Sequence, residues 1–169
     1  LSEVQLISGK NINIISIYQD LGTTGASYFT ARQAQIDVVE ALSLAGQLNQ
    51  PSRTPVYFAV DFDATDQQIT SNIIPYFKSI YQIILDRQGN PLEYKLGVYG
   101  SGKVCTAIRS QIESNAYTML ANATGWSGYN TFTSWNVKQG SIISLSTGSG
   151  SFTVDQSESS SLGSGEWRV

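Results

Sequence analysis

Short apolar segments typical of buried strands alternate along this chain with longer segments whose apolar residues have helical spacing. The expected strands cover residues 11–19, 55–62, 95–99 and 117–121, and the expected helices cover residues 29–48, 66–86 and 101–114. Consecutive parallel strands need a crossover, usually a helix, so this order predicts βα units and a parallel sheet in an α/β protein. Because residues 1–9 have the pattern of the end of a helix, the order starts with a helix. It is compatible with an open doubly wound sheet or with a barrel.

The last third of the chain has weaker signals. Residues 135–139 and 151–155 have the pattern of short strands, and the segment SIISLSTGSG between them is expected to form a hairpin or a surface excursion. Residues 158–169 are rich in Ser and Gly, which predicts a flexible tail, although Trp167 could dock. We therefore divide the chain into a domain at residues 1–157 and a tail at residues 158–169.

The composition excludes several classes of function. The chain has no histidine, which excludes Ser-His-Asp and Cys-His catalysis and histidine-ligated zinc within it. Its net charge is −3 without a cluster of Lys and Arg, so no nucleic-acid partner is expected. No apolar run approaches the roughly 18 residues of a membrane span. Cys105 has no partner for an internal disulfide and is expected to be a small buried hydrophobe. No cofactor and no metal are predicted.

The segment VYFAVDFD, residues 56–63, is the strongest strand pattern and carries two acidic residues. Side chains alternate between the faces of a strand, so one face would be wholly apolar, and the other would present Tyr57, Ala59, Asp61 and Asp63. On such a strand, the Cα atoms of Asp61 and Asp63 would lie about 6.5–7 Å apart. Both would lie at the carboxyl end of the strand, where the active sites of α/β barrels are found.

A pair of carboxylates in a shared pocket suits glycoside cleavage, which requires neither histidine, nor metal, nor nucleotide. One carboxyl group keeps its proton and donates it to the leaving oxygen, while the ionised one stabilises positive charge or orients a water molecule. The same Asp-x-Asp pattern is also found at helix N-caps, in divalent-cation sites and in turns, and the spacing alone leaves these alternatives open.

Aromatic residues near the expected strand ends favour a sugar site, because pyranose rings stack on aromatic faces. These residues are Tyr18, Tyr57, Tyr99, Trp126, Tyr129 and Trp135. Each of them, taken singly, is more often part of a core than of a binding site.

Several motifs resemble one bacterial family. The segments YFAVDFDAT, PYFKSIY and LGVYGSG, together with IISIYQD upstream and GWSGYN, SWNVKQ and FTVDQ downstream, are similar to the glycoside-hydrolase-like domain known as family 1906 of unknown function. That family is related to the glycoside hydrolase family 25 muramidases. The resemblance covers roughly residues 1–157, and VYFAVDFD and GVYGS are its most specific parts.

The resemblance implies a (β/α)8 TIM-like barrel in which VYFAVDFD is strand four. This chain would then contain strands three to eight, and the first βα units would be supplied by an upstream segment or another chain. In the muramidases the corresponding motif is Asp-x-Glu, with the Glu as general acid. Asp61 matches the Asp, whereas Asp63 replaces the Glu and is one methylene shorter. Tyr99, Gln139 and Asp155 resemble polar residues that end strands five, seven and eight.

Three hypotheses follow for the function. The first is a carbohydrate-active barrel, similar to a muramidase, that acts on bacterial cell-wall glycan (peptidoglycan) outside the cell or in the cell wall. Asp63 would be its acid and Asp61 its stabiliser, and the residues lining the sugar site would be Tyr18, Gln19, Tyr57, Tyr99, Trp126, Gln139 and Asp155. The second is a non-catalytic glycan-binding or cell-wall-anchoring module on the same fold. The third is a metal-dependent hydrolase with Asp61 and Asp63 as ligands.

Overall fold

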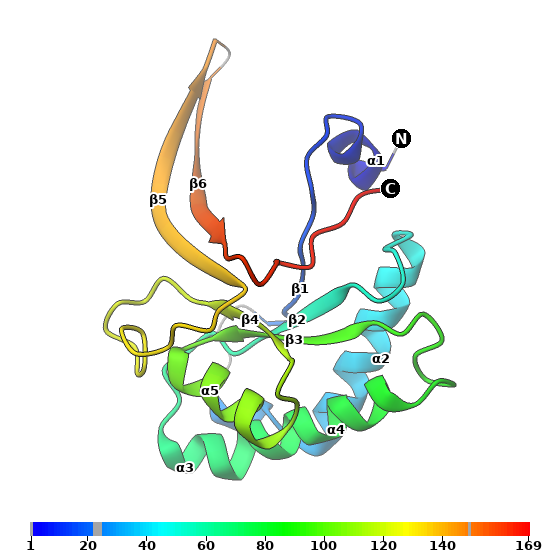
Figure 1. Cartoon of the computed structure of the whole chain (residues 1–169), viewed down its shortest axis with the longest axis vertical. Coiled ribbons are helices and arrows are strands. Elements are labelled where there is room, and N and C mark those ends of the chain that lie inside the picture. Colours follow the sequence, from blue (N-terminus) through cyan, green and yellow to red (C-terminus); the bar gives the residue numbers. More distant parts are fainter. Residues whose placement is uncertain (1, 22–24, 149) are drawn as a thin grey trace.

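The computed structural model describes residues 2–21, 25–148 and 150–169, and within them six strands form one curled sheet (Figure 1). The strands, which follow one another across the sheet in chain order, are β1 (Ser16–Tyr18), β2 (Pro55–Ala59), β3 (Lys95–Gly100), β4 (Tyr117–Leu120), β5 (Val137–Thr147) and β6 (Gly150–Ser159). Neighbours from β1 to β5 are parallel, and β6 is antiparallel to β5. The predicted α/β class with a parallel sheet is therefore confirmed, in the form of a half-barrel. Residues 22–24 of the loop after the first strand, and residue 149 of the expected hairpin, lie outside the described residues.

The helices that follow β1 cover one side of this sheet (Figure 1). The helical elements are α1 (Glu3–Ser8), η1 (Ala26–Tyr28), α2 (Ala31–Gln47), α3 (Asp66–Gln68), η2 (Ile69–Ile73, a π-helical turn), α4 (Ile74–Leu85) and α5 (Gly102–Gln111). The side chains of Thr30, Thr65 and Ser101 accept hydrogen bonds from the first turns of α2, α3 and α5, as N-cap residues do. Pro75 marks the start of α4, where its missing N–H is tolerated. None of the helices within the described residues is long and apolar enough to cross a lipid bilayer.

The period-two pattern of β2 separates two packed layers. Val56 and Phe58, together with Val60 after the strand, are buried in the large core between the sheet and the helices. Tyr57 lies on the opposite, concave face, where it forms a small cluster with Met119 and Val137. The alternation predicted for residues 56–60 is therefore confirmed, and it gives the sheet a helix-covered face and a concave face.

The C-terminal segment packs on the concave side of the sheet. The Tyr57 hydroxyl donates to the carbonyl oxygen of Ser164 at 2.7 Å, and both residues are buried. Trp167 is also buried, and its backbone pairs with Ile14 just before β1. Trp167 is therefore docked, whereas the flexibility expected of residues 158–169 stays a prediction. The division of the chain at residue 157 stays a prediction.

The hydrogen bond between Tyr57 and the tail gives a measurable prediction. Replacing Tyr57 with Phe should lower the free energy of unfolding by about 1–2 kcal/mol, because the buried Ser164 carbonyl loses its donor. Tyr129→Phe is the matched control, since the hydroxyl of Tyr129 makes only a 3.5 Å contact with Asn122 in an exposed position. Urea denaturation of both variants measures the difference. Equal costs would contradict the assigned role of Tyr57.

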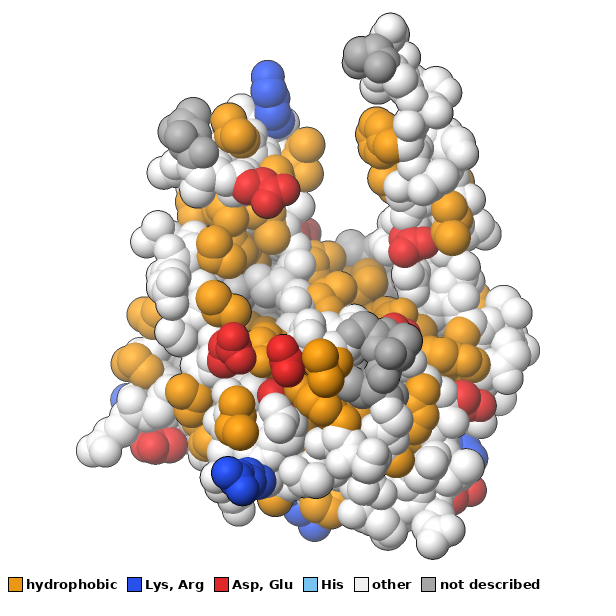
Figure 2. Space-filling view, turned by 180° about the vertical axis from the view of Figure 1, so that it is seen from behind, with side chains coloured by type: hydrophobic (Ala, Val, Ile, Leu, Met, Phe, Trp, Pro, Cys, Tyr) orange, Lys and Arg blue, Asp and Glu red, His pale blue; other side chains and the backbone are white. Residues whose placement is uncertain are grey.

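Two projections rise from the concave side and leave a hollow between them (Figures 1 and 2). One is the hairpin of β5 and β6, which extends well beyond the other four strands of the sheet. The other is α1 together with the C-terminus, where the backbone N–H of Val169 donates to the Ser8 hydroxyl at 3.2 Å. Within the segment SIISLSTGSG, residues 141–147 belong to β5 and residue 150 to β6, so the expectation of a hairpin is confirmed for these residues.

Candidate functional site

Several predicted site residues meet near the carboxyl ends of the first three strands. Gln19 follows β1, Asp61 follows β2, Tyr99 lies in β3, Gln139 in β5 and Asp155 in β6. We call these five residues the polar cluster. Parallel strands in register place their carboxyl ends at one edge, and Tyr99 packs beside the apolar cluster of the concave face. The polar cluster therefore faces the concave side rather than the helices.

Hydrogen bonds connect the polar cluster. The Tyr99 hydroxyl donates to Gln139 Oε1 at 3.0 Å, and Gln139 Nε2 donates to Asp155 Oδ2 at 2.9 Å. Gln19 Nε2 donates to Asp61 Oδ2 at 3.3 Å. These bonds fix the orientation of the Gln139 amide, because its two ends have different partners. The arrangement presents carboxylate, amide and phenol groups together on one surface.

Tyr99 lies between two carboxylates. Burial, followed by the negative charges of Asp61 and Asp155, raises its pKa to about 12. A raised pKa means that the phenol keeps its proton at neutral pH and loses it only when the pH rises through the folded-state value. Tyr99 is therefore a hydrogen-bond donor under physiological conditions.

The Asp63 carboxylate bonds to the loop after β4 and not to the residues of the polar cluster. Its Oδ1 accepts the backbone N–H of Ser127 at 2.9 Å and its Oδ2 accepts the Ser127 hydroxyl at 3.1 Å. The carbonyl oxygen of Ser127 in turn accepts the N–H of Lys103, in the first turn of α5, at 2.9 Å. Asp63 thus ties the loop after β4 to the loop after β2.

The expected geometry of the two acids differs from the observed one because the strand is shorter than its sequence pattern. β2 ends at Ala59, so Asp61 and Asp63 lie in the loop that follows, with a bend at Phe62. Strand alternation no longer applies to them there. Asp61 joins the polar cluster, while exposed Asp63 bonds to Ser127.

Three other predicted lining residues lie outside the polar cluster. Tyr18 is on the face of β1 that the helices cover, where it packs against Phe58 and donates to Glu40 of α2. Tyr57 is fully buried beneath the C-terminal segment. Trp126 is half-buried in the loop after β4, next to Ser127. The position of Tyr18 near a strand end does not define the face on which its side chain lies, so the sequence alone does not separate Tyr18 from the polar cluster.

Two residues at the site were missed from the sequence. The backbone N–H of Asn122 donates to Gln139 Oε1 at 3.1 Å, and Ser127 binds Asp63. Both lie in the loop after β4, and neither has a pattern that distinguishes it from an ordinary polar loop residue. Across residues 2–21, 25–148 and 150–169, no group of three or more Cys, Asp or Glu side chains is arranged to hold a metal ion.

Comparisons with known proteins agree with this fold. The family described as Rv2525c-like, glycoside hydrolase-like domain matches residues 1–166. The chain is 36% identical over 173 residues to the uncharacterized protein YbfG and 32% identical over 166 residues to the uncharacterized protein FadG, both of Bacillus subtilis (strain 168). These matches include 99% and 96% of this chain but 23% and 28% of the two relatives. The chain therefore spans about a quarter of the length of each relative.

Two solved structures share the architecture. Both are crystal structures of the Mycobacterium tuberculosis Tat-secreted protein Rv2525c, one in complex with HEPES and one with L-tartrate. Their TM-scores are 0.72 and 0.71 at 21% and 20% identity, and the matches cover 99% and 96% of this chain and 77% and 78% of theirs. At this level of identity the likeness shows a common fold.

Proposed function

Because the chain belongs to the Rv2525c-like, glycoside hydrolase-like domain family, we propose that it binds bacterial cell-wall glycan (peptidoglycan) at the polar cluster. The observation that carries the proposal is the convergence of Asp61, Tyr99, Gln139 and Asp155 on the concave side. Sugar hydroxyls both donate and accept hydrogen bonds. The carboxylates supply acceptors, the Tyr99 hydroxyl, whose proton is donated to Gln139, supplies a further acceptor, and the side-chain amides supply N–H donors.

Hydrolysis of the glycan is the second candidate. It is favoured by the two carboxylates, Asp61 and Asp155: Gln139 connects Asp155 to Tyr99 by hydrogen bonds, and the negative charges of both acids raise the pKa of Tyr99. A carboxylate pair is what glycoside cleavage requires. Asp63 is less suited to be the acid of this pair, because both of its oxygens accept hydrogen bonds from Ser127. In this candidate, Asp61 stabilises the reacting sugar and Asp155 takes part in place of Asp63.

The same proposal includes the cellular location of the protein and the architecture of the complete barrel. The curled sheet has the shape expected of part of a TIM-like barrel related to the family 25 muramidases, with further βα units from an upstream segment or another chain. The related fold of a Tat-secreted protein supports export, and a glycan-binding role places the domain outside the cell or in the cell wall. The organic anions in the two Rv2525c crystals support a site that accepts small polar ligands on this fold.

Binding and cleavage are measured in parallel on the same protein. We expect the protein to sediment with insoluble peptidoglycan, and Asp61→Asn and Asp155→Asn each to weaken retention about tenfold, as loss of a hydrogen bond to a charged group does. Asp66→Asn, on the exposed first turn of α3, is the matched control and should stay within about twofold of the parent protein.

The release of reducing ends distinguishes the two candidates. Retention without new reducing ends supports a binding module. New reducing ends that disappear in both Asp61→Asn and Asp155→Asn support a hydrolase. Absence of both retention and cleavage would contradict the proposal, as would equal losses in Asp66→Asn.

A further inference from the structure

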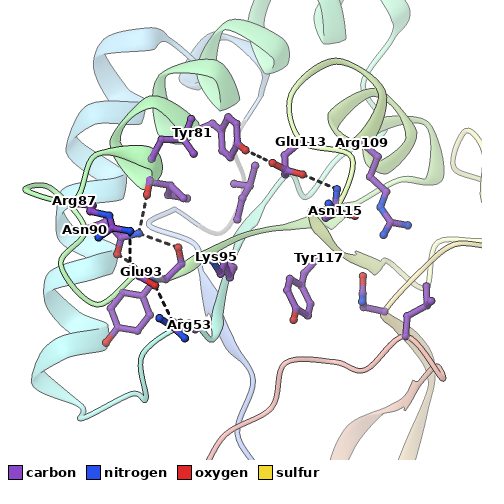
Figure 3. Close-up of a pocket in the computed structure, with 16 residues that line it drawn as sticks. Arg53, Tyr81, Arg87, Asn90, Glu93, Lys95, Arg109, Glu113, Asn115 and Tyr117 are labelled. Atoms are coloured by element: carbon purple, nitrogen blue, oxygen red, sulfur yellow. Dashed lines mark hydrogen bonds and ion pairs between the residues drawn. The ribbon is translucent and has the colours of Figure 1, made fainter.

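Figure 3 shows a cavity that lies apart from the polar cluster. Arg53 comes just before β2, Lys95 begins β3 and Tyr117 begins β4, so the cavity lies at the amino ends of these strands. Its volume is about 660 Å³, which is in the range of small-molecule sites. The wall also includes Arg109 of α5 and Leu162 of the C-terminal segment.

The cavity concentrates positive charge in an acidic protein. Four basic side chains and two acidic ones line it, namely Arg53, Arg87, Lys95, Arg109, Glu93 and Glu113. The difference of two positive charges contrasts with the net charge of −3 for the whole chain, which has 10 Lys and Arg residues in total. The cavity therefore favours an anionic ligand over a neutral or cationic one.

The two acidic residues do not neutralise the cavity evenly. Glu93 forms ion pairs with Arg53 at 2.8 Å and with Arg87 at 3.7 Å, so its negative charge is shared by the two arginines at one side of the cavity (Figure 3). Glu113 accepts the Tyr81 hydroxyl and the backbone N–H of Asn115. The ion pairs of the described residues do not include Lys95 or Arg109.

Arg109 carries an unused buried donor. One of its terminal nitrogens donates to the carbonyl oxygen of Ser134, whereas its Nε is buried and has no hydrogen-bond partner among the described residues. Buried N–H groups without a partner are rare in proteins, and a bound ligand or water molecule is one of the ordinary ways in which such a group is satisfied. Guanidinium groups bind carboxylate and phosphate through paired N–H donors.

We propose that this cavity binds a small ligand with two acidic groups, either carboxylates or phosphates. One acidic group binds Arg109, and the other binds Lys95. Tyr117 lies between Lys95 and Arg109 in Figure 3, where its ring contacts the part of the ligand that joins the acidic groups. Because Leu162 lines the same cavity, the bound ligand also contacts the C-terminal segment.

Calorimetric titration with inorganic pyrophosphate and with citrate, at an ionic strength held constant with sodium chloride, tests the proposal. We expect saturable binding of at least one of them. Tighter binding of pyrophosphate identifies a phosphate ligand, and tighter binding of citrate identifies a carboxylate ligand. The charge-removing variants Lys95→Gln and Arg109→Gln should each weaken binding about fivefold or more.

Two controls separate this site from general electrostatics and from the glycan site. Lys78→Gln removes the same charge from an exposed position on α4 and should leave the affinity unchanged. Asp61→Asn should also leave it unchanged, so failure here is distinct from failure of the glycan proposal. Lys95 is exposed, so Lys95→Gln remains informative even where Arg109→Gln does not fold. Absence of saturable binding of both anions, or an equal loss in Lys78→Gln, overturns the proposal.

Discussion

Replacing Asp37 with Ala should lower the free energy of unfolding by about 3–5 kcal/mol, because three buried or half-buried donors lose their common acceptor. Asp37 of α2 is fully buried. Its carboxylate accepts the Tyr28 hydroxyl, the Tyr76 hydroxyl at 2.5 Å and the Gln33 side-chain amide at 2.7 Å. No basic side chain is among its ion-pair partners within the described residues, so these neutral donors are what stabilises the buried charge.

The two tyrosines remain donors over the whole practical pH range. Burial, followed by hydrogen bonding to Asp37, raises the pKa of both Tyr28 and Tyr76 above the ordinary value of 10.0. The stability that they contribute is thus fully present below pH 10 and is lost only as the pH rises through the higher folded-state values. Titration of these tyrosines should accordingly add no difference between the effects of Asp37→Ala at pH 6 and at pH 8, which lie about two units or more below that limit.

Glu40 provides the matched control on the same helix. Its carboxylate accepts the Tyr18 hydroxyl at 2.9 Å, but in an exposed position, so Glu40→Ala should cost less than about 1 kcal/mol. Asp37→Asn keeps the shape of the side chain and one acceptor oxygen, so its cost in free energy of unfolding should fall between those of Asp37→Ala and Glu40→Ala. Urea denaturation of the three variants gives the order. A cost for Asp37→Ala no larger than that for Glu40→Ala would show that the buried network does not stabilise the fold.

The elements that the sequence predicts well are those whose signal is local. Pro75 marks a helix boundary wherever it stands, since it has no N–H, and α4 begins next to it. Val56 and Phe58 alternate with Tyr57, and the alternation alone assigns the two faces of β2. These features depend on neighbouring residues in the chain, so no knowledge of the tertiary structure is needed to find them.

The candidate site was less predictable because it depends on where strands stop and loops turn. Asp61 and Asp63 continue the alternating pattern of β2, but the strand ends at Ala59 and the two acids diverge. Gln139 and Asp155 are brought together by the pairing of β5 with β6, including an irregularity in register between Gln139 and Ile142. A bulge of this kind leaves no distinct pattern in the sequence.

The loop after β4 depends on a close backbone approach that only glycine allows. A Cβ atom added to Gly102, at the start of α5, would lie 2.2 Å from the carbonyl oxygen of Gly128 and 2.9 Å from the Cβ atom of Phe132. Gly128 itself has a φ of +81°, and a Cβ atom added to it would lie 2.6 Å from the backbone nitrogen of Lys103. Since the nearest obstructing atoms belong to the backbone of Gly128, they cannot move aside as a flexible side chain can.

Gly102→Ala should therefore lower the free energy of unfolding by about 3 kcal/mol or more, as severe overpacking does. It should also weaken glycan retention, because displacing Gly128 shifts Ser127, which Asp63 holds, and the neighbouring Trp126. Gly46→Ala is the matched control in α2, where nothing lies within 4 Å of the added atom, and it should stabilise the protein by up to about 1 kcal/mol. Urea denaturation and peptidoglycan sedimentation measure the two effects. If Gly102→Ala retained full stability, the loop after β4 could not be positioned by this contact, and the coupling of α5 to the site would be wrong.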